Sequence, residues 1–140
     1  MNSTKITVSA WIDAPLAKAW DSYTNPAHIV NWNYADAGWH CPSAFNDMKI
    51  GGLYKARMAA RDGSFGFDFE AVYTEIAVEN YFTYEFGGRV ATVEFRKTDN
   101  KTEVVVTFDA ETENPVDLQK AGWQAILNNF KIYTETVLVG

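Results

Sequence analysis

The sequence has one cysteine, two histidines and no long apolar run, and each shortage excludes a class of protein. A single cysteine, Cys41, cannot form an internal disulfide and fits a reducing compartment. His28 and His40 lack the paired spacing of a metal site, because structural zinc takes four ligands and catalytic zinc takes three. No stretch is long and apolar enough for a signal peptide or a membrane span. We therefore expect a soluble cytoplasmic protein that holds no metal and no other cofactor.

Positive charge is also in short supply. The chain has 12 Lys and Arg against 18 Asp and Glu, which gives a net charge of −6 and a pI of about 4.8. Nucleic acids and anionic membrane surfaces both require cationic patches, so we expect neither as a partner. What the sequence does contain is apolar and aromatic: 47% of its residues are hydrophobic and 15% are aromatic. The 140 residues are enough for one core, and we expect residues 1–140 to form a single domain. The aromatic residues either enlarge that core or line a cavity.

The first third of the chain predicts one strand and two short helices. Residues 5–12 alternate between apolar and polar side chains, which is typical of a strand, and Trp11 falls on the outer side. Asp13 is the expected cap of the first helix, with Pro15 in its first turn. Asn25 is the expected cap of the second helix, which Pro26 opens and which runs to about Trp32. Residues 33–50 have no clear period and are expected to be irregular.

The rest of the chain predicts an antiparallel meander followed by a long helix. Five strand-like segments between residues 53 and 112 are joined by tight connections containing "DGS", "VEN", "GG" and "DNK". The helix begins after Asn114 and Pro115 and runs for about 22 residues. Its expected apolar face consists of Leu118, Gly122, Ile126, Phe130, Tyr133 and Val137. The prediction is an α+β fold in which a curved antiparallel sheet of six to seven strands surrounds the long helix.

The order and spacing of short motifs resemble a known superfamily. The opening "VSAWIDAPLAKAWDSYTNPAHIVNW" resembles that of the START-like, birch-pollen-allergen-like (SRPBCC) superfamily, through Ala14, Pro15, Trp20, Pro26 and Trp32. It is most similar to the branch related to the C-terminal domain of the activator of the heat-shock-protein-90 ATPase. "IGGLYKARMAARDGSFGFDF" and "GWQAILNNFKIY" resemble the double-glycine hairpin and the last helix of that branch. The resemblance covers essentially the whole chain and implies a helix-grip fold with a cavity between the sheet and the long helix. Members of the superfamily bind lipids, sterols, polyketides or hormones, act as enzymes, or assist a chaperone, so the fold alone does not decide the function.

The expected cavity is lined by aromatic and apolar residues. In the strands, one alternating set of side chains faces the long helix, and it contains small residues that leave room for a ligand. The pocket candidates are Trp32, Trp39, His40, Tyr54, Met58, Phe67, Phe69, Tyr84, Trp123 and Leu127. Gly122 has two alternative roles: it admits a bulky neighbour such as Trp20 or Trp32, or it forms the floor of the pocket beside Trp123.

Candidate catalytic groups compete with simpler interpretations. Asp68 and Glu70 alternate with Phe67 and Phe69, so they face solvent if the aromatic rings face the helix. If a bulge reverses that strand, they line the cavity opposite Arg57 and act there as acid or base.

The predicted irregular segment offers a second polar set, Asp36, Trp39 and His40, which either covers the cavity mouth or forms its own small cluster. Cys41 follows His40 directly, but adjacent side chains rarely face each other in a catalytic arrangement. An ordinary half-buried cysteine is therefore favoured.

Three functions follow from these patterns, in order of preference. The first is a binding protein for a small hydrophobic or aromatic molecule. The second is an enzyme of the same fold, of the cyclase, hydrolase or lyase type, which requires a carboxylate or histidine inside the pocket. The third is a co-chaperone-like interaction module, which the resemblance permits. Independently, the outward-facing Trp11 is a candidate contact for a homodimer.

Overall fold

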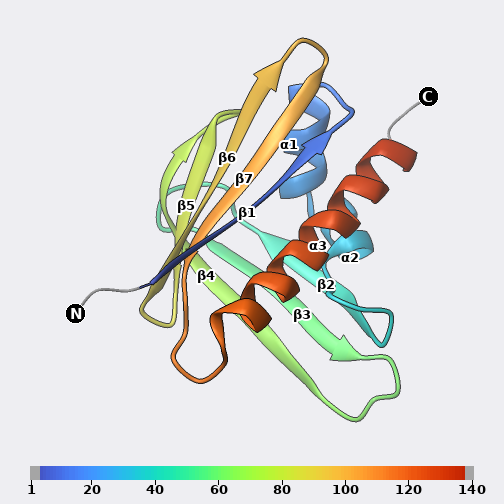
Figure 1. Cartoon of the computed structure of the whole chain (residues 1–140), viewed down its shortest axis with the longest axis vertical. Coiled ribbons are helices and arrows are strands. Elements are labelled where there is room, and N and C mark those ends of the chain that lie inside the picture. Colours follow the sequence, from blue (N-terminus) through green and yellow to red (C-terminus); the bar gives the residue numbers. More distant parts are fainter. Residues whose placement is uncertain (1–3, 138–140) are drawn as a thin grey trace.

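The structure is a computed structural model that describes residues 4–137. It contains a seven-stranded antiparallel sheet in the order β1-β7-β6-β5-β4-β3-β2, together with three helices (Figure 1). The strands are β1 (Lys5–Ile12), β2 (Trp39–Asn46), β3 (Leu53–Ala60), β4 (Gly66–Ala77), β5 (Tyr81–Phe86), β6 (Arg89–Thr98) and β7 (Lys101–Asp109). The helices are α1 (Leu16–Thr24), α2 (Pro26–Trp32) and α3 (Val116–Val137). The predicted α+β helix-grip architecture is confirmed.

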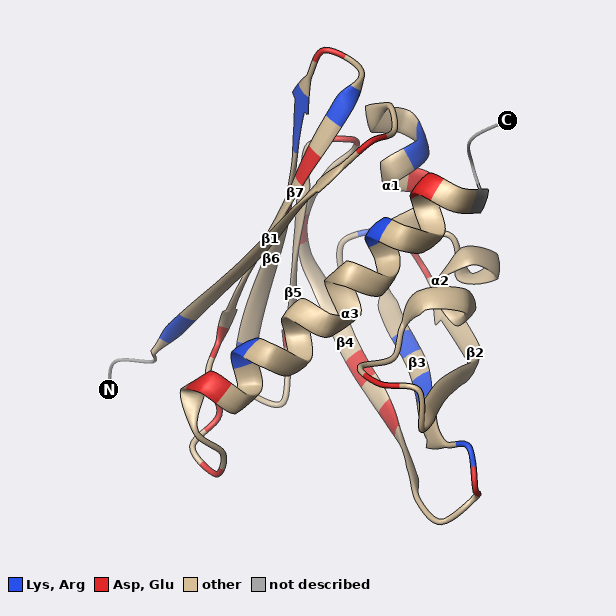
Figure 2. Ribbon diagram, turned by 45° about the vertical axis from the view of Figure 1, so that its right-hand side comes forward, with Lys and Arg blue, Asp and Glu red and all other residues tan. Residues whose placement is uncertain are grey.

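The sheet curls around α3, which crosses its concave side (Figures 1 and 2). Side chains of α3 connect the helix to the edge strand β1 and to the segment that follows α2. Gln124 donates to the carbonyl of Ser9 in β1, and Asn129 donates to the carbonyl of Tyr34 just beyond α2. Lysines and arginines are interspersed with acidic residues along the ribbon in Figure 2. In the part of the chain that the structure describes, no helix is both long and apolar enough to cross a membrane.

The prediction for residues 33–50 was wrong, because this segment contains the edge strand β2. The strand pairs with β3, but its register shifts between His40 and Ser43, on either side of Pro42. Proline has no N–H to donate to a ladder, so within sheets it is confined to edges and bulges. The same irregularity interrupts the alternation of side chains, which is why the sequence did not reveal the strand.

One helix cap is confirmed and the other was wrong. The Asn25 side chain accepts a hydrogen bond from the backbone N–H of Ala27 at the start of α2. In α1 the capping position is Pro15, which has no side-chain cap. Asp13 is not the cap: its backbone N–H donates to Glu135 of α3, so this residue connects the end of β1 to the last helix.

An aromatic cluster fills the space between the sheet and the helices α1 and α2. The Tyr23 ring lies 4.9 Å from that of Phe130 and 5.0 Å from that of Trp32, measured between centroids. Trp20 packs edge-on against Phe95 of the sheet. The inward sets of β5, β6 and β7 are buried as the alternation predicted. The core is therefore densely packed at this end, and the remaining space lies under the N-terminal half of α3.

The buried face of α3 differs from the predicted stripe. Leu127, Phe130 and Thr134 are buried, whereas Leu118 is 60% exposed. The first turns of α3 border an open hollow, so apolar residues there have no sheet surface to cover them. The side chain of Val137 lies outside the described residues. On the other face of the sheet Trp11 is 49% exposed, and its contribution to a homodimer stays a prediction.

Candidate functional site

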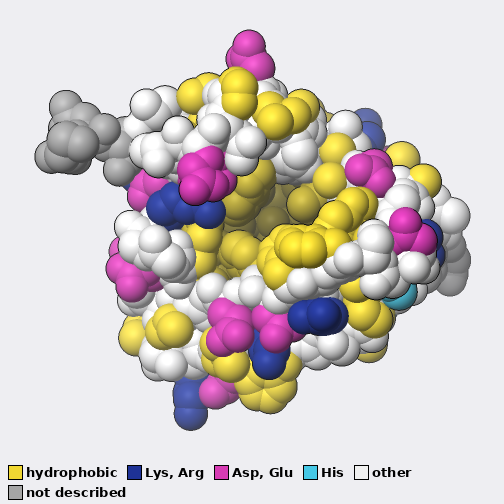
Figure 3. Space-filling view, turned by 90° about the horizontal axis from the view of Figure 1, so that it is seen from below, with side chains coloured by type: hydrophobic (Ala, Val, Ile, Leu, Met, Phe, Trp, Pro, Cys, Tyr) yellow, Lys and Arg dark blue, Asp and Glu magenta, His cyan; other side chains and the backbone are white. Residues whose placement is uncertain are grey.

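An aromatic-lined pocket lies between the sheet and the N-terminal half of α3. Its volume is about 270 Å³, and it shares four lining residues (Met58, Phe67, Trp123 and Ile126) with an outer hollow of about 370 Å³. Seen from below, the molecule has an opening whose walls are hydrophobic and whose rim carries charged residues (Figure 3). The inner pocket therefore connects to the surface through the outer hollow.

The structure brings most of the predicted pocket residues together. Eight of the ten line the inner pocket, namely Trp32, Tyr54, Met58, Phe67, Phe69, Tyr84, Trp123 and Leu127. Trp39 lies instead in the outer hollow, where its ring is 6.1 Å from that of Phe67. His40 lines neither space, because it follows Trp39 in β2 and successive side chains of a strand point to opposite faces.

Trp123 forms a rigid wall of the pocket. Its indole stacks on the ring of Phe108 in β7, with centroids 3.9 Å apart and planes inclined by 12°. The centroid of the Phe86 ring lies 6.0 Å from that of Trp123. These contacts fix the orientation of the indole.

Five pocket residues were missed: Tyr23, Asn33, Arg89, Val106 and Ile126. Val106 belongs to the inward set predicted for its strand, and Ile126 belongs to the apolar face predicted for the long helix. Arg89 could have been found in the same way, since it precedes the inward-facing Ala91 by two residues on one strand. Asn33 follows the last residue of α2, and no period in the sequence indicates the direction of its side chain.

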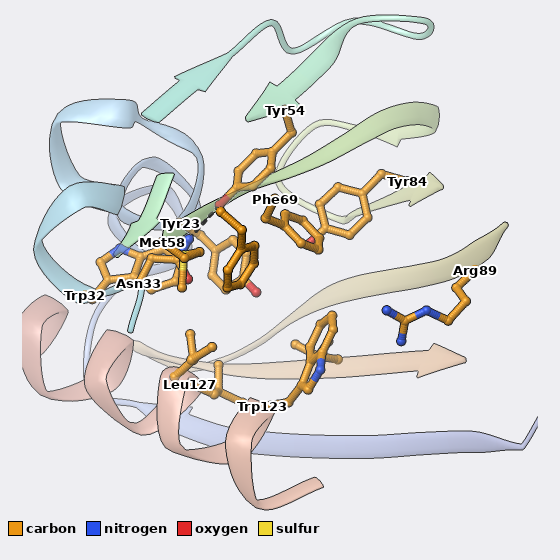
Figure 4. Close-up of a pocket in the computed structure, with 13 residues that line it drawn as sticks. Tyr23, Trp32, Asn33, Tyr54, Met58, Phe69, Tyr84, Arg89, Trp123 and Leu127 are labelled. Atoms are coloured by element: carbon orange, nitrogen blue, oxygen red, sulfur yellow. Dashed lines mark hydrogen bonds between the residues drawn. The ribbon is translucent and has the colours of Figure 1, made fainter. Parts of the chain in front are cut away.

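Three tyrosine hydroxyls provide polar groups inside the apolar walls (Figure 4). The Tyr54 hydroxyl accepts a hydrogen bond of 3.2 Å from Asn33 Nδ2. Among the described residues no hydrogen bond involves the hydroxyl of Tyr23 or of Tyr84, and both rings are directed into the pocket (Figure 4). Two polar groups are thus available to a ligand.

The pocket tyrosines are held in the neutral phenol form. Burial raises the pKa of Tyr84, and it raises the pKa of Tyr23 and Tyr54 well above the usual value, with smaller contributions from neighbouring tyrosines. A phenol of raised pKa donates and accepts hydrogen bonds at neutral pH but is not a general base. The tyrosines are suited to orienting a bound molecule.

Arg89 supplies a cation at the end of the pocket opposite Trp32 (Figure 4). Its guanidinium carbon lies 4.7 Å from the centroid of the Phe86 ring, and Nη1 donates to the Asp109 carbonyl over 3.4 Å. The Asp109 carboxylate itself pairs with Lys5 and accepts from the backbone N–H of Val90. In the described part of the chain, no carboxylate forms an ion pair with Arg89.

The candidate catalytic carboxylates lie outside the pocket. The pairing of β3 with β4 is regular from Leu53 to Ala59, so no bulge reverses the strand there. Asp68 and Glu70 are exposed, and Asp68 lies 3.4 Å from Arg57 and 3.7 Å from Lys55 on the outer face. The alternative in which these acids and Arg57 face the cavity is therefore wrong.

Of the second polar set, Asp36 and Trp39 border the outer hollow at the mouth of the pocket, as one of the two alternatives expected, whereas His40 does not. Asp36 is an exposed residue bordering the outer hollow. Cys41 is buried, its thiol donates to the carbonyl of Ser43 over 3.3 Å, and burial raises the pKa of that thiol. Within the described residues, no three His, Cys, Asp or Glu side chains come together in a way that could hold a metal ion.

Gly122 borders the outer hollow and does not admit a bulky neighbour. A Cβ placed on this residue would have no atom within 4 Å outside its own helix segment. Trp32 packs against Phe130 and Tyr23, and Trp20 packs against Phe95 and Phe82. The close-packing role is excluded, and the glycine lies beside open space at the pocket entrance.

These features define a helix-grip protein with an aromatic-lined pocket under its long helix. The family model described as "Activator of Hsp90 ATPase homolog 1-like protein" matches residues 13–135. The chain belongs to this family, which is part of the SRPBCC superfamily.

Solved structures agree with this assignment. The chain is similar to the AHSA1-like protein from Aeromonas hydrophila, with 37% identity, a TM-score of 0.90, and coverage of 96% of this chain and 94% of the other. A protein from Cytophaga hutchinsonii shares 45% identity over the same fractions, with a TM-score of 0.81. A protein from Chromobacterium violaceum, at 19% identity, shares the fold with a TM-score of 0.83 over 94% of this chain and 98% of the other. No curated protein gives a match.

Proposed function

We propose that this protein binds a small, largely apolar molecule with an aromatic ring in the pocket beneath α3. The observation that carries the proposal is the combination of aromatic walls with unpartnered hydroxyls. Small-molecule sites are typically apolar concavities in which a few polar groups fix the orientation of the ligand. Tyr23 and Tyr84 supply such groups here.

The size of the pocket restricts the ligand. At about 270 Å³ the inner pocket is slightly smaller than typical small-molecule sites, which span roughly 300–1,000 Å³. A molecule with one ring and a short chain fits this space, and the outer hollow accommodates a longer chain. Trp123 would contact the ring, because its indole is already immobilised by Phe108.

The same geometry favours a binding function over a catalytic one. A reaction would need a general acid or base within hydrogen-bond reach of the substrate. Among the described residues, those lining the inner pocket include no carboxylate, imidazole or thiol. The titratable groups present are tyrosines of raised pKa and Arg89, which favours recognition of a ligand.

The test is a thermal-shift titration with 4-phenyl-1-butanol, a neutral molecule of one ring and a short chain. A ligand that binds only the folded state raises the unfolding temperature as its concentration rises. We expect such a rise for the wild type. In the variant Leu127→Trp the larger ring occupies the inner pocket, and we expect the rise to be lost.

Ile132→Trp is the matched control, because Ile132 is 62% exposed on the outer side of the same helix. It should respond to the alcohol like the wild type. Circular dichroism of both variants without ligand verifies that they fold. An equal response in Leu127→Trp, or no response in the wild type, would contradict the proposal.

A further inference from the structure

We infer that the ligand is a carboxylic acid whose carboxylate is bound by Arg89 and whose apolar body extends toward Trp32. This inference rests on the proposed function and adds the chemical class of the ligand. It depends on the position of Arg89, on the absence of a paired acid, and on the gradient of polarity along the pocket.

The backbone directs Arg89 inward. The turn between β5 and β6 contains Gly87 and Gly88, both with positive φ (57° and 81°), and β6 begins immediately afterwards with Arg89. Arg89, Ala91 and Val93 share one face of the strand, and the last two are buried in the core. Figure 4 shows the guanidinium extending toward Trp123 at one end of the pocket.

Among the described residues no carboxylate forms an ion pair with Arg89, although its charge is close enough to help lower the pKa of the Asp109 carboxyl. Of the side chains that line the inner pocket in the described structure, Arg89 alone carries a charge at neutral pH. The nearby Asp109 carboxylate is directed to Lys5 and to the backbone N–H of Val90. Arg89 itself makes one long hydrogen bond, to a carbonyl, and a contact with the Phe86 ring. A guanidinium has five N–H donors, so several are left for a ligand.

These donors suit a carboxylate. Two parallel N–H groups of a guanidinium match the two oxygens of a carboxylate, and hydrogen bonds between ionised groups are stronger than neutral ones. The opposite end of the pocket, with Trp32, Met58 and Leu127, is mainly apolar, and the Asn33 amide there donates to the Tyr54 hydroxyl (Figure 4). An amphipathic acid complements both ends, with its carboxylate at Arg89 and its ring or chain among the apolar residues.

The experiment compares two probes with the same carbon skeleton by isothermal titration calorimetry: 4-phenylbutanoate, which ends in a carboxylate, and 4-phenyl-1-butanol, which ends in a neutral hydroxyl. We expect the wild type to bind the acid about tenfold more tightly than the alcohol, as for a charge-assisted hydrogen bond in a partly exposed site. In Arg89→Gln this preference should disappear, because the acid loses its ion pair with the guanidinium whereas the alcohol loses at most one hydrogen bond. Circular dichroism and urea unfolding verify that the variant is folded.

Two further variants complete the design. Arg96→Gln removes the same charge from the same strand, but at an exposed site beside Glu94 and Glu103, and should keep the preference for the acid. Arg89→Lys keeps a positive charge and should retain part of that preference.

The outcomes separate the two proposals. Equal binding of acid and alcohol by the wild type overturns the carboxylate inference and leaves the proposed function in place. A preference that persists in Arg89→Gln also overturns it, because another group must then bind the acid. If neither probe binds the wild type, both the inference and the proposed function fail.

Discussion

At the scale of single residues, buried tyrosines differ in what their hydroxyls bind. The Tyr73 hydroxyl donates to Asn46 Oδ1 over 2.7 Å, whereas the Tyr84 hydroxyl, in the pocket, makes no hydrogen bond to a described residue. Tyr73→Phe should therefore lower the free energy of unfolding by about 1 kcal/mol, since it leaves the amide oxygen unpaired. Tyr84→Phe should change it by less than about 0.5 kcal/mol, because no internal bond is lost. Urea unfolding of both variants measures the difference, and an equal loss in the two would contradict this assignment.

A second residue-scale prediction concerns Gly122 in the middle of α3. Glycine in a helix interior costs about 1 kcal/mol relative to alanine, and an added Cβ would meet no neighbouring atom within 4 Å. We expect Gly122→Ala to raise the free energy of unfolding by about 0.5–1 kcal/mol. The matched control is Gly52→Ala, whose Cβ would lie 2.1 Å from the carbonyl oxygen of Asp47 and should be strongly destabilising. A loss of stability in Gly122→Ala, measured by urea unfolding, would show that the space beside this residue is not open.

At the scale of elements, a buried pair of hydroxyls joins α1 to α3. Ser22 Oγ and Thr134 Oγ1 are 2.7 Å apart, and both residues have no exposed surface. Ser22→Ala or Thr134→Val alone leaves one hydroxyl unpaired, so each should cost about 1–3 kcal/mol of unfolding free energy. The double variant should lose clearly less than the sum of the two single losses. Additive losses in the double-mutant cycle would mean that the two hydroxyls are not coupled.

The ion pair between Lys5 of β1 and Asp109 of β7 predicts that the stability of the protein depends on pH. The hydrogen bond from Lys5 is the main cause that lowers the pKa of Asp109, helped by the N–H of Val90 and by the charges of Lys5 and Arg89, against the effect of burial. A carboxyl with a lowered pKa in the folded state stabilises the protein at pH values above its unfolded pKa. That contribution is lost as the pH falls through the folded value.

Asp109→Asn should therefore be less stable than the wild type by about 1 kcal/mol at pH 7. The difference should shrink as the pH is lowered through about 4 and below, where the wild-type carboxyl also becomes neutral. Urea unfolding of both proteins across this range measures it. A difference that does not change with pH would contradict an ionised Asp109 as its source.

At the scale of the whole molecule, the fold follows from periodic patterns that the chain keeps in most of its elements. The alternation in β1 and in β3 to β7 and the apolar spacing in α3 predicted the sheet and the helix that it surrounds. The edge strand β2 could not be predicted, because Pro42 and the register shift beside it remove the alternation. The capping role predicted for Asp13 was also wrong. Its backbone N–H donates to Glu135, and no local pattern reveals a contact between residues so far apart in the sequence.

The site was predictable to the extent that it depends on the same periodicity. Residues such as Phe69 and Tyr84 line the pocket because they belong to inward sets. His40 was predicted to line the pocket because the strand β2, which turns its side chain away, was not recognised. Arg89 was missed because an arginine is not expected among the inward-facing residues of a strand. Whether Gly122 faces a side chain or open space depends on the curvature of the sheet, and no local pattern determines that.

The most direct test of the central claim, that the pocket under α3 binds a small aromatic molecule, is a heteronuclear NMR titration with 4-phenylbutanoate. The probes are the Trp123 indole N–H and the methyl groups of Met58 and Leu127, which all line the inner pocket. We expect their signals to shift together and to saturate at one ligand per protein. The signals of Trp11 and Ile132, on exposed outer surfaces, should stay in place. Pocket signals that do not move at millimolar ligand, or shifts confined to those outer residues, would contradict the claim.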